Sequence, residues 1–308
     1  MENLSENPSK MAASVPMLTV FTNVMRDFLT LTKPGVLSLV LFTGYVGLIL
    51  APFKIGFLQA CLSLIAIALG SGGAGAINMW YDHDIDLIMK RTQNRPIPCG
   101  RISPKTGLMF GLILSFSSVI LMLISANVKA AGLLAFSIFF YVIIYTVWLK
   151  RRTPQNIVIG GAAGAFPPVI GWMATGSPLT LEPYLLFLII FLWTPPHFWA
   201  LALNKSQDYE RAKVPMMPNV AGVFKTRQQI FYYTLALVIS AWMPWFAHIR
   251  GHLYSVIATV LGSIFFYYAL KIFQKGDQRD CTRLFLFSIL YLFILFFGML
   301  LDYYLGDL

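Results

Sequence analysis

The stretch Asn78-Met-Trp-Tyr-Asp82-His-Asp84-Ile-Asp86 begins in the last residues of an apolar run at residues 57–80 and extends beyond it. A helix needs about 20 apolar residues to cross the hydrocarbon core of a bilayer, and this run is long enough. Carboxylates beside a bilayer are costly, so acids that persist there are usually functional. We therefore predict a transmembrane helix that ends in a polar site at the membrane boundary.

The rest of the chain repeats this apolar pattern. It is 57% hydrophobic and only 12% charged over 308 residues, which excludes an ordinary soluble globular domain. We predict an all-α integral membrane protein with nine transmembrane helices. Residues 1–30 would be a cytoplasmic N-terminal tail, and residues 31–305 a single transmembrane domain. The predicted spans are 36–53, 57–80, 107–126, 130–149, 157–175, 183–203, 228–248, 254–272 and 284–304.

The charge pattern predicts the orientation of these spans. The net charge is +10, but the Lys and Arg residues lie in short breaks between apolar runs, so nucleic acid is not an expected partner. Basic residues concentrate after the second, fourth, sixth and eighth spans. The positive-inside rule then places these loops and the N-terminus in the cytoplasm and the C-terminus outside. Because the N-terminal residues resemble neither a secretory signal nor a mitochondrial presequence, we expect a bacterial cytoplasmic (inner) membrane, with lipid around the helices.

Two connections, 81–106 and 204–227, are longer than the others, and each contains a pair of prolines. An even number of predicted spans separates them, so both face the same side. This spacing is typical of two four-helix blocks that form a parallel repeat, and it predicts that the loops converge on one site. The two halves share no clear sequence identity, so coincidence stays open.

The first long connection begins with a row of oxygen-bearing side chains. Positions four apart in a helix advance about 40° beyond a full turn, so Asn78, Asp82 and Asp86 share a face. Magnesium takes such oxygen ligands, together with water and substrate phosphate. Asp84 faces elsewhere and is available to a basic neighbour. The alternative is a solvated helix end whose charge is offset by Lys90.

Basic residues in the same connection favour an anion site. Lys90, Arg91 and Arg95 follow the acids closely and can neutralise phosphate oxygens that a metal does not reach. Each of them alone is better explained as an orientation signal. Together with the carboxylates, they predict a metal-dependent phosphate site.

The second long connection is the weaker copy. Asn204 and Asp208 share a helical face, but no further oxygen ligand continues it. His197 lies within a predicted span, after two prolines that disturb helical hydrogen bonding. An intramembrane histidine is a candidate heme ligand, proton carrier or polar contact. A structural hydrogen bond to the backbone freed by the prolines is the alternative.

These motifs resemble the UbiA-type intramembrane prenyltransferases and, within them, the branch that modifies heme. The acidic stretch and the following Pro96-Ile-Pro98-Cys-Gly100-Arg101 are similar to the first signature of that family, and the resemblance extends over about residues 25–300. The family often has a second motif with two aspartates four apart, whereas here Asp208 stands without such a partner. Further matches are Leu31-Thr-Lys33-Pro34, Gly160 to Pro168, Trp193-Thr-Pro-Pro196-His197-Phe198 and Val214-Pro215-Met-Met-Pro218.

The resemblance implies transfer of farnesyl from farnesyl diphosphate to a vinyl group of heme B. It implies Mg²⁺ as cofactor, and a heme A-forming enzyme or terminal oxidase assembly as partner. A quinone-precursor prenyltransferase and a transporter are the alternatives; the first would use a phenolic acceptor, and the second would need no diphosphate site. In the implied farnesyl transfer, Asn78, Asp82 and Asp86 would bind the metal and take part in catalysis, together with Asp208. Diphosphate would be bound by Lys90, Arg91, Arg95, Lys150, Arg151 and Lys205. His197 is the candidate for heme binding, because it lies within a predicted span.

Overall fold

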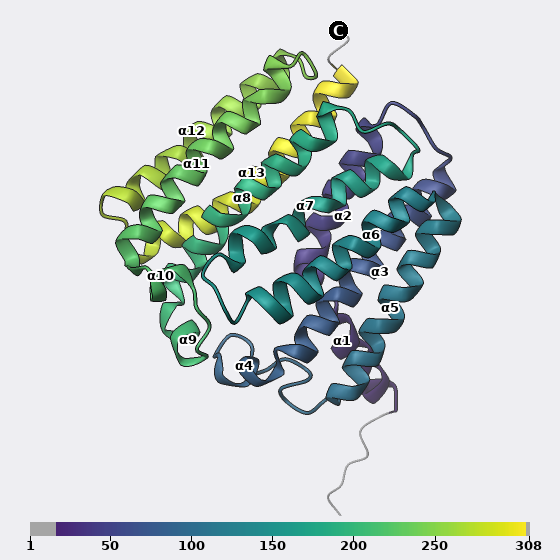
Figure 1. Cartoon of the computed structure of the whole chain (residues 1–308), viewed down its shortest axis with the longest axis vertical. Helices are drawn as coiled ribbons and strands as arrows, with labels where there is room; N and C mark the ends of the chain where they lie inside the picture. Colours follow the sequence, from purple (N-terminus) through teal and green to yellow (C-terminus); the bar gives the residue numbers. More distant parts are fainter. Residues whose placement is uncertain (1–16, 306–308) are drawn as a thin grey trace, which may run out of the picture.

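The computed structural model describes residues 17–305 as helices and their connections, with no strand in that range (Figure 1). The all-helical prediction is therefore confirmed for this part of the chain. The elements are α1 (Met17–Leu31), α2 (Pro34–Leu50), α3 (Phe57–Tyr81), α4 (His83–Ile88), α5 (Pro104–Ser125), α6 (Val128–Phe139), the π-helix η2 (Phe140–Leu149), α7 (Asn156–Ala174), α8 (Leu181–Asn204), α9 (Ser206–Arg211), α10 (Met217–Val220), α11 (Gly222–Phe246), α12 (His252–Gln274) and α13 (Gln278–Leu305).

Most of the predicted spans correspond to long apolar helices. In the described range, seven helical segments are long and apolar enough to cross a membrane: α3, α5, α6 with η2, α7, α8, α12 and α13. Part of α1 (Phe21–Leu31) and α2 meet at a bend of 56° and would together make an eighth. Helix α11, which ends at Phe246, corresponds to the predicted span 228–248 but is not one of the seven apolar segments. The chain is thus a multi-pass membrane protein, and the count of nine stays a prediction.

The predicted N-terminal tail is partly helical. Residues 1–16 lie outside the described part of the chain, and residues 17–31 form α1. This helix is attached to the rest of the bundle by an aromatic contact between Phe28 and Phe110, with ring centroids 4.9 Å apart. Arg101 Nε also donates to both carboxylate oxygens of Asp27 at 3.0 Å. The boundary between tail and domain at residue 31 stays a prediction.

Small residues let the spans approach one another closely. A Cβ atom on Gly47 of α2 would lie 1.9 Å from the carbonyl oxygen of Pro168 in α7, and one on Gly171 of α7 would lie 2.0 Å from the carbonyl oxygen of Gly44. Within a bilayer, helices associate through such close packing because lipid offers no hydrophobic drive between them. Glycines therefore fix how α2 and α7 pack.

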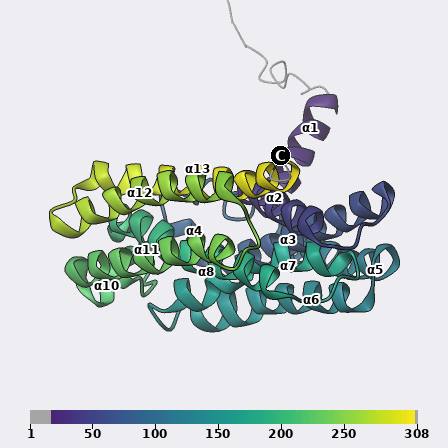
Figure 2. The ribbon, with the colours of Figure 1, turned by 90° about the horizontal axis from the view of Figure 1, so that it is seen from above.

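Both long connections lie at one end of the bundle. In Figure 1, α4 and α9 lie at the end opposite the C-terminus. Figures 1 and 2 agree that α11 and α12 lie at one edge, α3 and α5 at the other, and α7 and α8 between them. The fold thus brings the predicted acidic loop and the second loop to the same side, as their even spacing requires.

Candidate active site

The row of oxygen-bearing side chains, Asn78, Asp82 and Asp86, continues across the break between two helices. α3 ends at Tyr81 and α4 begins at His83, yet the amide of Asp82 still donates to the Asn78 carbonyl (3.0 Å) and that of Asp86 to the Asp82 carbonyl (2.8 Å). The spacing of four is therefore kept across the boundary. All three side chains are buried; Asp82 is 0% exposed.

A hydrogen-bonded chain links this row to two other elements. The Asn78 amide nitrogen donates to Asp82 Oδ2 at 2.7 Å and to Thr146 Oγ1 in η2 at 3.0 Å. Lys33 Nζ donates to Asn78 Oδ1 at 2.5 Å and to the Tyr141 hydroxyl at 3.3 Å. Asn78 is thus held on both sides of its amide, which fixes its orientation.

Each buried acid in the row has a basic partner. Lys150 Nζ forms an ion pair with Asp82, and Arg95 Nη1 lies 2.6 Å from Asp86 Oδ2. Lys33 contacts Asn78, and Arg151 Nη2 lies 3.6 Å from Asp82 Oδ1, so four basic side chains contact a row that has two carboxylates. Burial without pairing is costly for any charge, and the excess of positive charge makes this region suited to a further anion.

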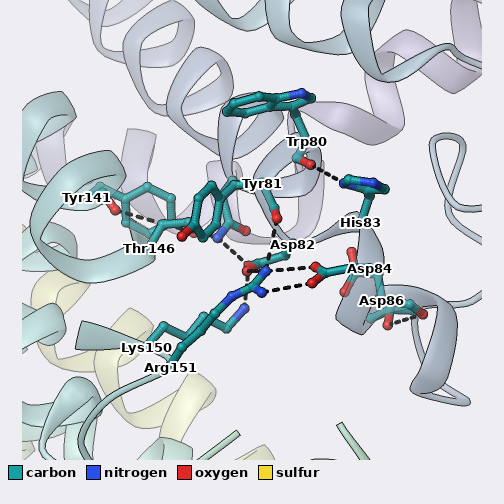
Figure 3. Close-up of polar contacts among 12 residues, drawn as sticks. Trp80, Tyr81, Asp82, His83, Asp84, Asp86, Tyr141, Thr146, Lys150 and Arg151 are labelled. Atoms are coloured by element: carbon teal, nitrogen blue, oxygen red, sulfur yellow. Dashed lines mark hydrogen bonds and ion pairs between the residues drawn. The ribbon is translucent and has the colours of Figure 1, made fainter. Parts of the chain in front are cut away.

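Asp84 pairs with Arg151, which lies between Asp84 and Asp82 (Figure 3). Arg151 Nη1 and Nη2 donate to the two carboxylate oxygens of Asp84 at 2.8 and 2.7 Å, and Nη2 also donates to the Tyr81 carbonyl at 3.0 Å. These hydrogen bonds lower the pKa of Asp84 below its ordinary value. Arg151 therefore fastens α4 to the segment after η2, and its nearest contact with Asp82 is longer, at 3.6 Å.

The π-helix η2 supplies much of the wall around the acids. It carries Tyr141 and Thr146, Lys150 follows it directly, and Thr146 Oγ1 donates to the Tyr141 carbonyl five residues earlier at 2.9 Å. π-helical turns are rare and often occur at functional sites, because they shift side chains out of α-helical register. Here the shift accompanies two polar contacts with the acidic row.

One carboxylate oxygen of this cluster, Asp82 Oδ1, lies 3.6 Å from Arg151 Nη2 but lacks a hydrogen bond. Asp82 Oδ1 is buried and accepts no hydrogen bond from any described residue, although buried polar atoms are nearly always satisfied. No group of three His, Cys, Asp or Glu side chains in the described range could hold a metal by itself. The donor set fits a hard cation such as Mg²⁺, which takes one or two protein carboxylates and fills its other positions with water and phosphate.

An intramembrane cavity adjoins the acidic row. Its volume is about 110 Å³, and it lies between α2, α3, the α6–η2 segment and α7. Lys33 and Tyr141 line it, and most of its other walls are apolar or small side chains, including Gly70 and Gly75. Because Lys33 also contacts Asn78, one cation links the membrane cavity with the polar site.

The remaining predicted phosphate ligands lie elsewhere. Lys90 and Arg91 are exposed. Lys90 lines a second cavity, together with Lys205 and Asp208 from the other long connection. Asp208 forms an ion pair with Arg211. The structure therefore brings the two connections together at this second cavity, and it does not place Asp208 among the contacts of the acidic row.

His197 is buried between α8 and α13. Its Nδ1 atom shares a hydrogen bond with Ser288 Oγ at 2.6 Å. The ring stacks between Trp193 and Phe285, with centroid distances of 4.4 and 4.6 Å. These contacts satisfy the side chain within the helix pair, and His197 lines neither of the two cavities. Its contact with heme stays a prediction.

Three residues of the site were not singled out from the sequence for a role. Lys33, Tyr141 and Thr146 come from segments far from the acidic stretch, and only their packing brings them there. Lys33 did carry a signal, because it precedes a proline in a break within apolar sequence; its backbone is left-handed, with φ 55°. The two η2 residues carried none.

The fold and the site define a multi-pass membrane protein that handles an anionic ligand beside an intramembrane cavity. The sequence model of the UbiA prenyltransferase family matches residues 40–298, and the chain belongs to this family. It is 53% identical over 281 residues to a protoheme IX farnesyltransferase of Bartonella tribocorum, covering 90% of both chains. It is 54% identical over 280 residues to protoheme IX farnesyltransferase 2 of Mesorhizobium japonicum, covering 90% of this chain and 89% of the relative.

Solved structures support the same fold. A digeranylgeranylglyceryl phosphate synthase superposes with a TM-score of 0.76 at 18% identity, covering 91% of this chain and 98% of that one. A UbiA homologue from Archaeoglobus fulgidus, bound to GPP and Mg²⁺, superposes with a TM-score of 0.62 at 16% identity, covering 89% and 99%. At these identities the likeness concerns the helical architecture alone.

Proposed function

We propose that this protein transfers the farnesyl group of farnesyl diphosphate to a vinyl group of heme B, which gives heme O and releases diphosphate. The names and the extent of the relatives support the reaction. The observation that carries it within the chain is the buried Asp82 oxygen that accepts no hydrogen bond, beside four basic side chains and a largely apolar cavity. A metal-bound diphosphate with an isoprenoid tail has the matching chemistry.

Asn78, Asp82 and Asp86 would hold the metal through their side-chain oxygens. When bound, Mg²⁺ would offset the negative charge that develops on the departing diphosphate. Lys150 and Arg95 hold the two carboxylates in place and offset their charge through ion pairs. We further propose, from their sequence positions, that Asp208 contributes to catalysis and that Arg91 and Arg151 contact phosphate. Lys90 and Lys205, which the sequence also predicted as phosphate ligands, line the second cavity instead.

The cavity wall would enclose the isoprenoid chain of the donor, and Lys33 would lie where the cavity meets the polar site. The cavity is lined mainly by apolar and small side chains, which suits an isoprenoid chain and excludes water from an allylic cation. The allylic carbon–oxygen bond breaks, and its electron pair leaves with diphosphate. The vinyl π electrons of heme form the new carbon–carbon bond. Water then adds to the resulting porphyrin-side cation and loses one proton, so that atoms and charge balance.

The proposed setting is the bacterial cytoplasmic membrane, with the N-terminus and both long connections in the cytoplasm and the C-terminus outside. The basic residues of these connections support that orientation. Heme O would then pass to a heme A-forming enzyme or to terminal oxidase assembly. We also propose that His197 lies near the porphyrin, since it is placed within a span.

Mass spectrometry of hemes tests the reaction. Membranes that contain the protein would be supplied with heme B, farnesyl diphosphate and Mg²⁺, and compared with membranes that contain Asp82→Asn. We expect farnesylated heme with the wild type and its loss with the variant. A prenylated phenolic acid in place of a heme product would overturn the proposal and assign the chain to quinone-precursor chemistry.

A further inference from the structure

The second cavity differs from the acidic site in its residues and charge. Its volume is about 460 Å³, and it lies between the end of α8, α9, the start of α11 and the α12–α13 connection, with Lys90 from the first long connection. None of Asn78, Asp82 and Asp86 lines it. Four basic side chains, Lys90, Lys205, Arg211 and Arg227, line it against two acidic ones, Asp208 and Asp277. The lining thus has an excess of two positive charges.

The two acids of this cavity are already engaged. Asp208 is paired with Arg211, and Asp277 Oδ1 accepts the backbone amide of Asp280 at 2.9 Å, at the start of α13. Asn204 and Asp208 of the lining are four residues apart, but position 212 is alanine, so no third oxygen ligand continues them as in the acidic row. A magnesium-bound diphosphate, which needs such ligands, suits the acidic row better than this cavity.

Its cations, in contrast, are available. Within the described part of the chain, Lys90 and Lys205 have no side-chain hydrogen bond or ion pair. Arg227 Nη2 donates to the Gly276 carbonyl at 2.6 Å, while its Nε atom is buried without a partner. A buried N–H without an acceptor is rare and calls for a ligand or water. Lys90, Lys205 and Arg227 can therefore donate hydrogen bonds to the oxygens of a dianion.

We propose that this cavity binds the two propionate carboxylates of the porphyrin acceptor. The proposal rests on the proposed function, in which the acceptor is heme B. Heme carries its propionates on the edge opposite its vinyl groups, and charged carboxylates must stay at the membrane surface because burial in lipid is costly. A cavity at the end of the bundle with two excess positive charges matches this edge.

The two long connections pack against each other beside this cavity. Ile85 and Met89 of the first connection and Tyr209 and Val214 of the second are buried in one apolar cluster. Lys90 follows Met89 directly, so this packing holds Lys90 near Lys205 in the cavity wall.

Heme titration and kinetics of the full chain in lipid nanodiscs test the proposal. The variant is Lys90→Gln with Lys205→Gln, and the matched control is Lys225→Gln, which removes an exposed charge from α11 outside the cavity lining. We expect the double variant to raise the KM for heme B about tenfold, equivalent to about 1.4 kcal/mol. The KM for farnesyl diphosphate should stay unchanged in the double variant. Lys225→Gln should leave the KM for both substrates unchanged.

A second acceptor isolates the carboxylates. Iron protoporphyrin IX dimethyl ester lacks both charges, so the wild type and the double variant should bind it equally. Equal weakening of acid and ester, or a higher KM for farnesyl diphosphate, would overturn the proposal; the latter would return these lysines to the diphosphate role expected from sequence. Lys90→Arg with Lys205→Arg keeps the charge and should bind heme B normally.

The outcome is separable from that of the proposed function. Heme titration without farnesyl diphosphate reports on the cavity alone, whatever product is formed. If wild-type protein formed no farnesylated heme but still bound the acid more tightly than the ester, with the difference lost in the double variant, the cavity assignment would stand and the reaction would not.

Discussion

Asp82 and Asp84 form a matched pair for testing whether geometry or charge makes the site. Asp82→Asn and Asp84→Asn each remove one negative charge from the same helix end. The Asp82 side chain is fully buried and forms an ion pair with Lys150. The Asp84 side chain is 53% exposed and forms an ion pair with Arg151. Of the two, only Asp82 has a buried oxygen that accepts no hydrogen bond.

The expected magnitudes differ accordingly. Breaking a buried ion pair costs about 3–5 kcal/mol, because it leaves a charge uncompensated. We expect Asp82→Asn to lie at the low end, since the variant amide can still accept from Lys150. Losing an exposed pair costs about 0–1 kcal/mol. For activity, removal of one group that stabilises developing charge costs about 10²–10³ in rate, which we expect for Asp82→Asn alone.

The assay is farnesylated heme formed per minute at a series of Mg²⁺ concentrations, with the apparent Tm of each purified variant. Asp82→Asn should lose activity at every concentration and have a lower Tm. Asp84→Asn should stay within about fivefold of the wild type, because a free-energy change of at most about 1 kcal/mol alters a rate by no more than that factor. Equal losses in both variants would refute the reasoning, since loop charge and not ligand geometry would then control the rate.

Three further predictions concern other parts of the molecule. Arg151 lowers the pKa of Asp84. The stability that this pair contributes is therefore present above the unfolded pKa of about 3.9 and is lost as pH falls through the folded pKa. The Tm difference between the wild type and Asp84→Asn should shrink between pH 7 and pH 3. Gly47→Ala should cost about 1–3 kcal/mol through overpacking against α7, measured as Tm, while Gly132→Ala, where a Cβ meets open space, should be neutral or stabilising. His197→Ala should lower the Tm because two ring stacks are lost, and unchanged heme titration would remove this residue from the heme site.

Much of the site could be read from local sequence. The relation among Asn78, Asp82 and Asp86 depends only on helical periodicity, and it persists because i to i+4 hydrogen bonds continue across the break at Asp82. The same periodicity leaves Asp84 out of this row. Lys150 and Arg151 were chosen by resemblance to the family, and the structure assigns them unequal roles: Lys150 pairs with buried Asp82, while Arg151 holds exposed Asp84.

Long-range packing decided what local patterns could not. Whether Lys90 and Lys205 face the acidic row or a separate cavity depends on how the two connections pack, and no periodicity within either connection contains that information. The same holds for Asp208, whose nearest cation proved to be Arg211.

The sequence by itself determined the membrane-spanning helical class, the acidic row and the side of the bundle on which the long connections lie. These follow from apolar length, helical period and the cost of charge in lipid, which act over a few turns of one chain segment. Only the tertiary structure brought Lys33 and Thr146 of η2 to Asn78 and left one buried Asp82 oxygen without a hydrogen bond. These contacts join residues 45 and 68 positions apart, and they exist because glycine-lined helices pack closely enough to bring distant polar groups within hydrogen-bonding range.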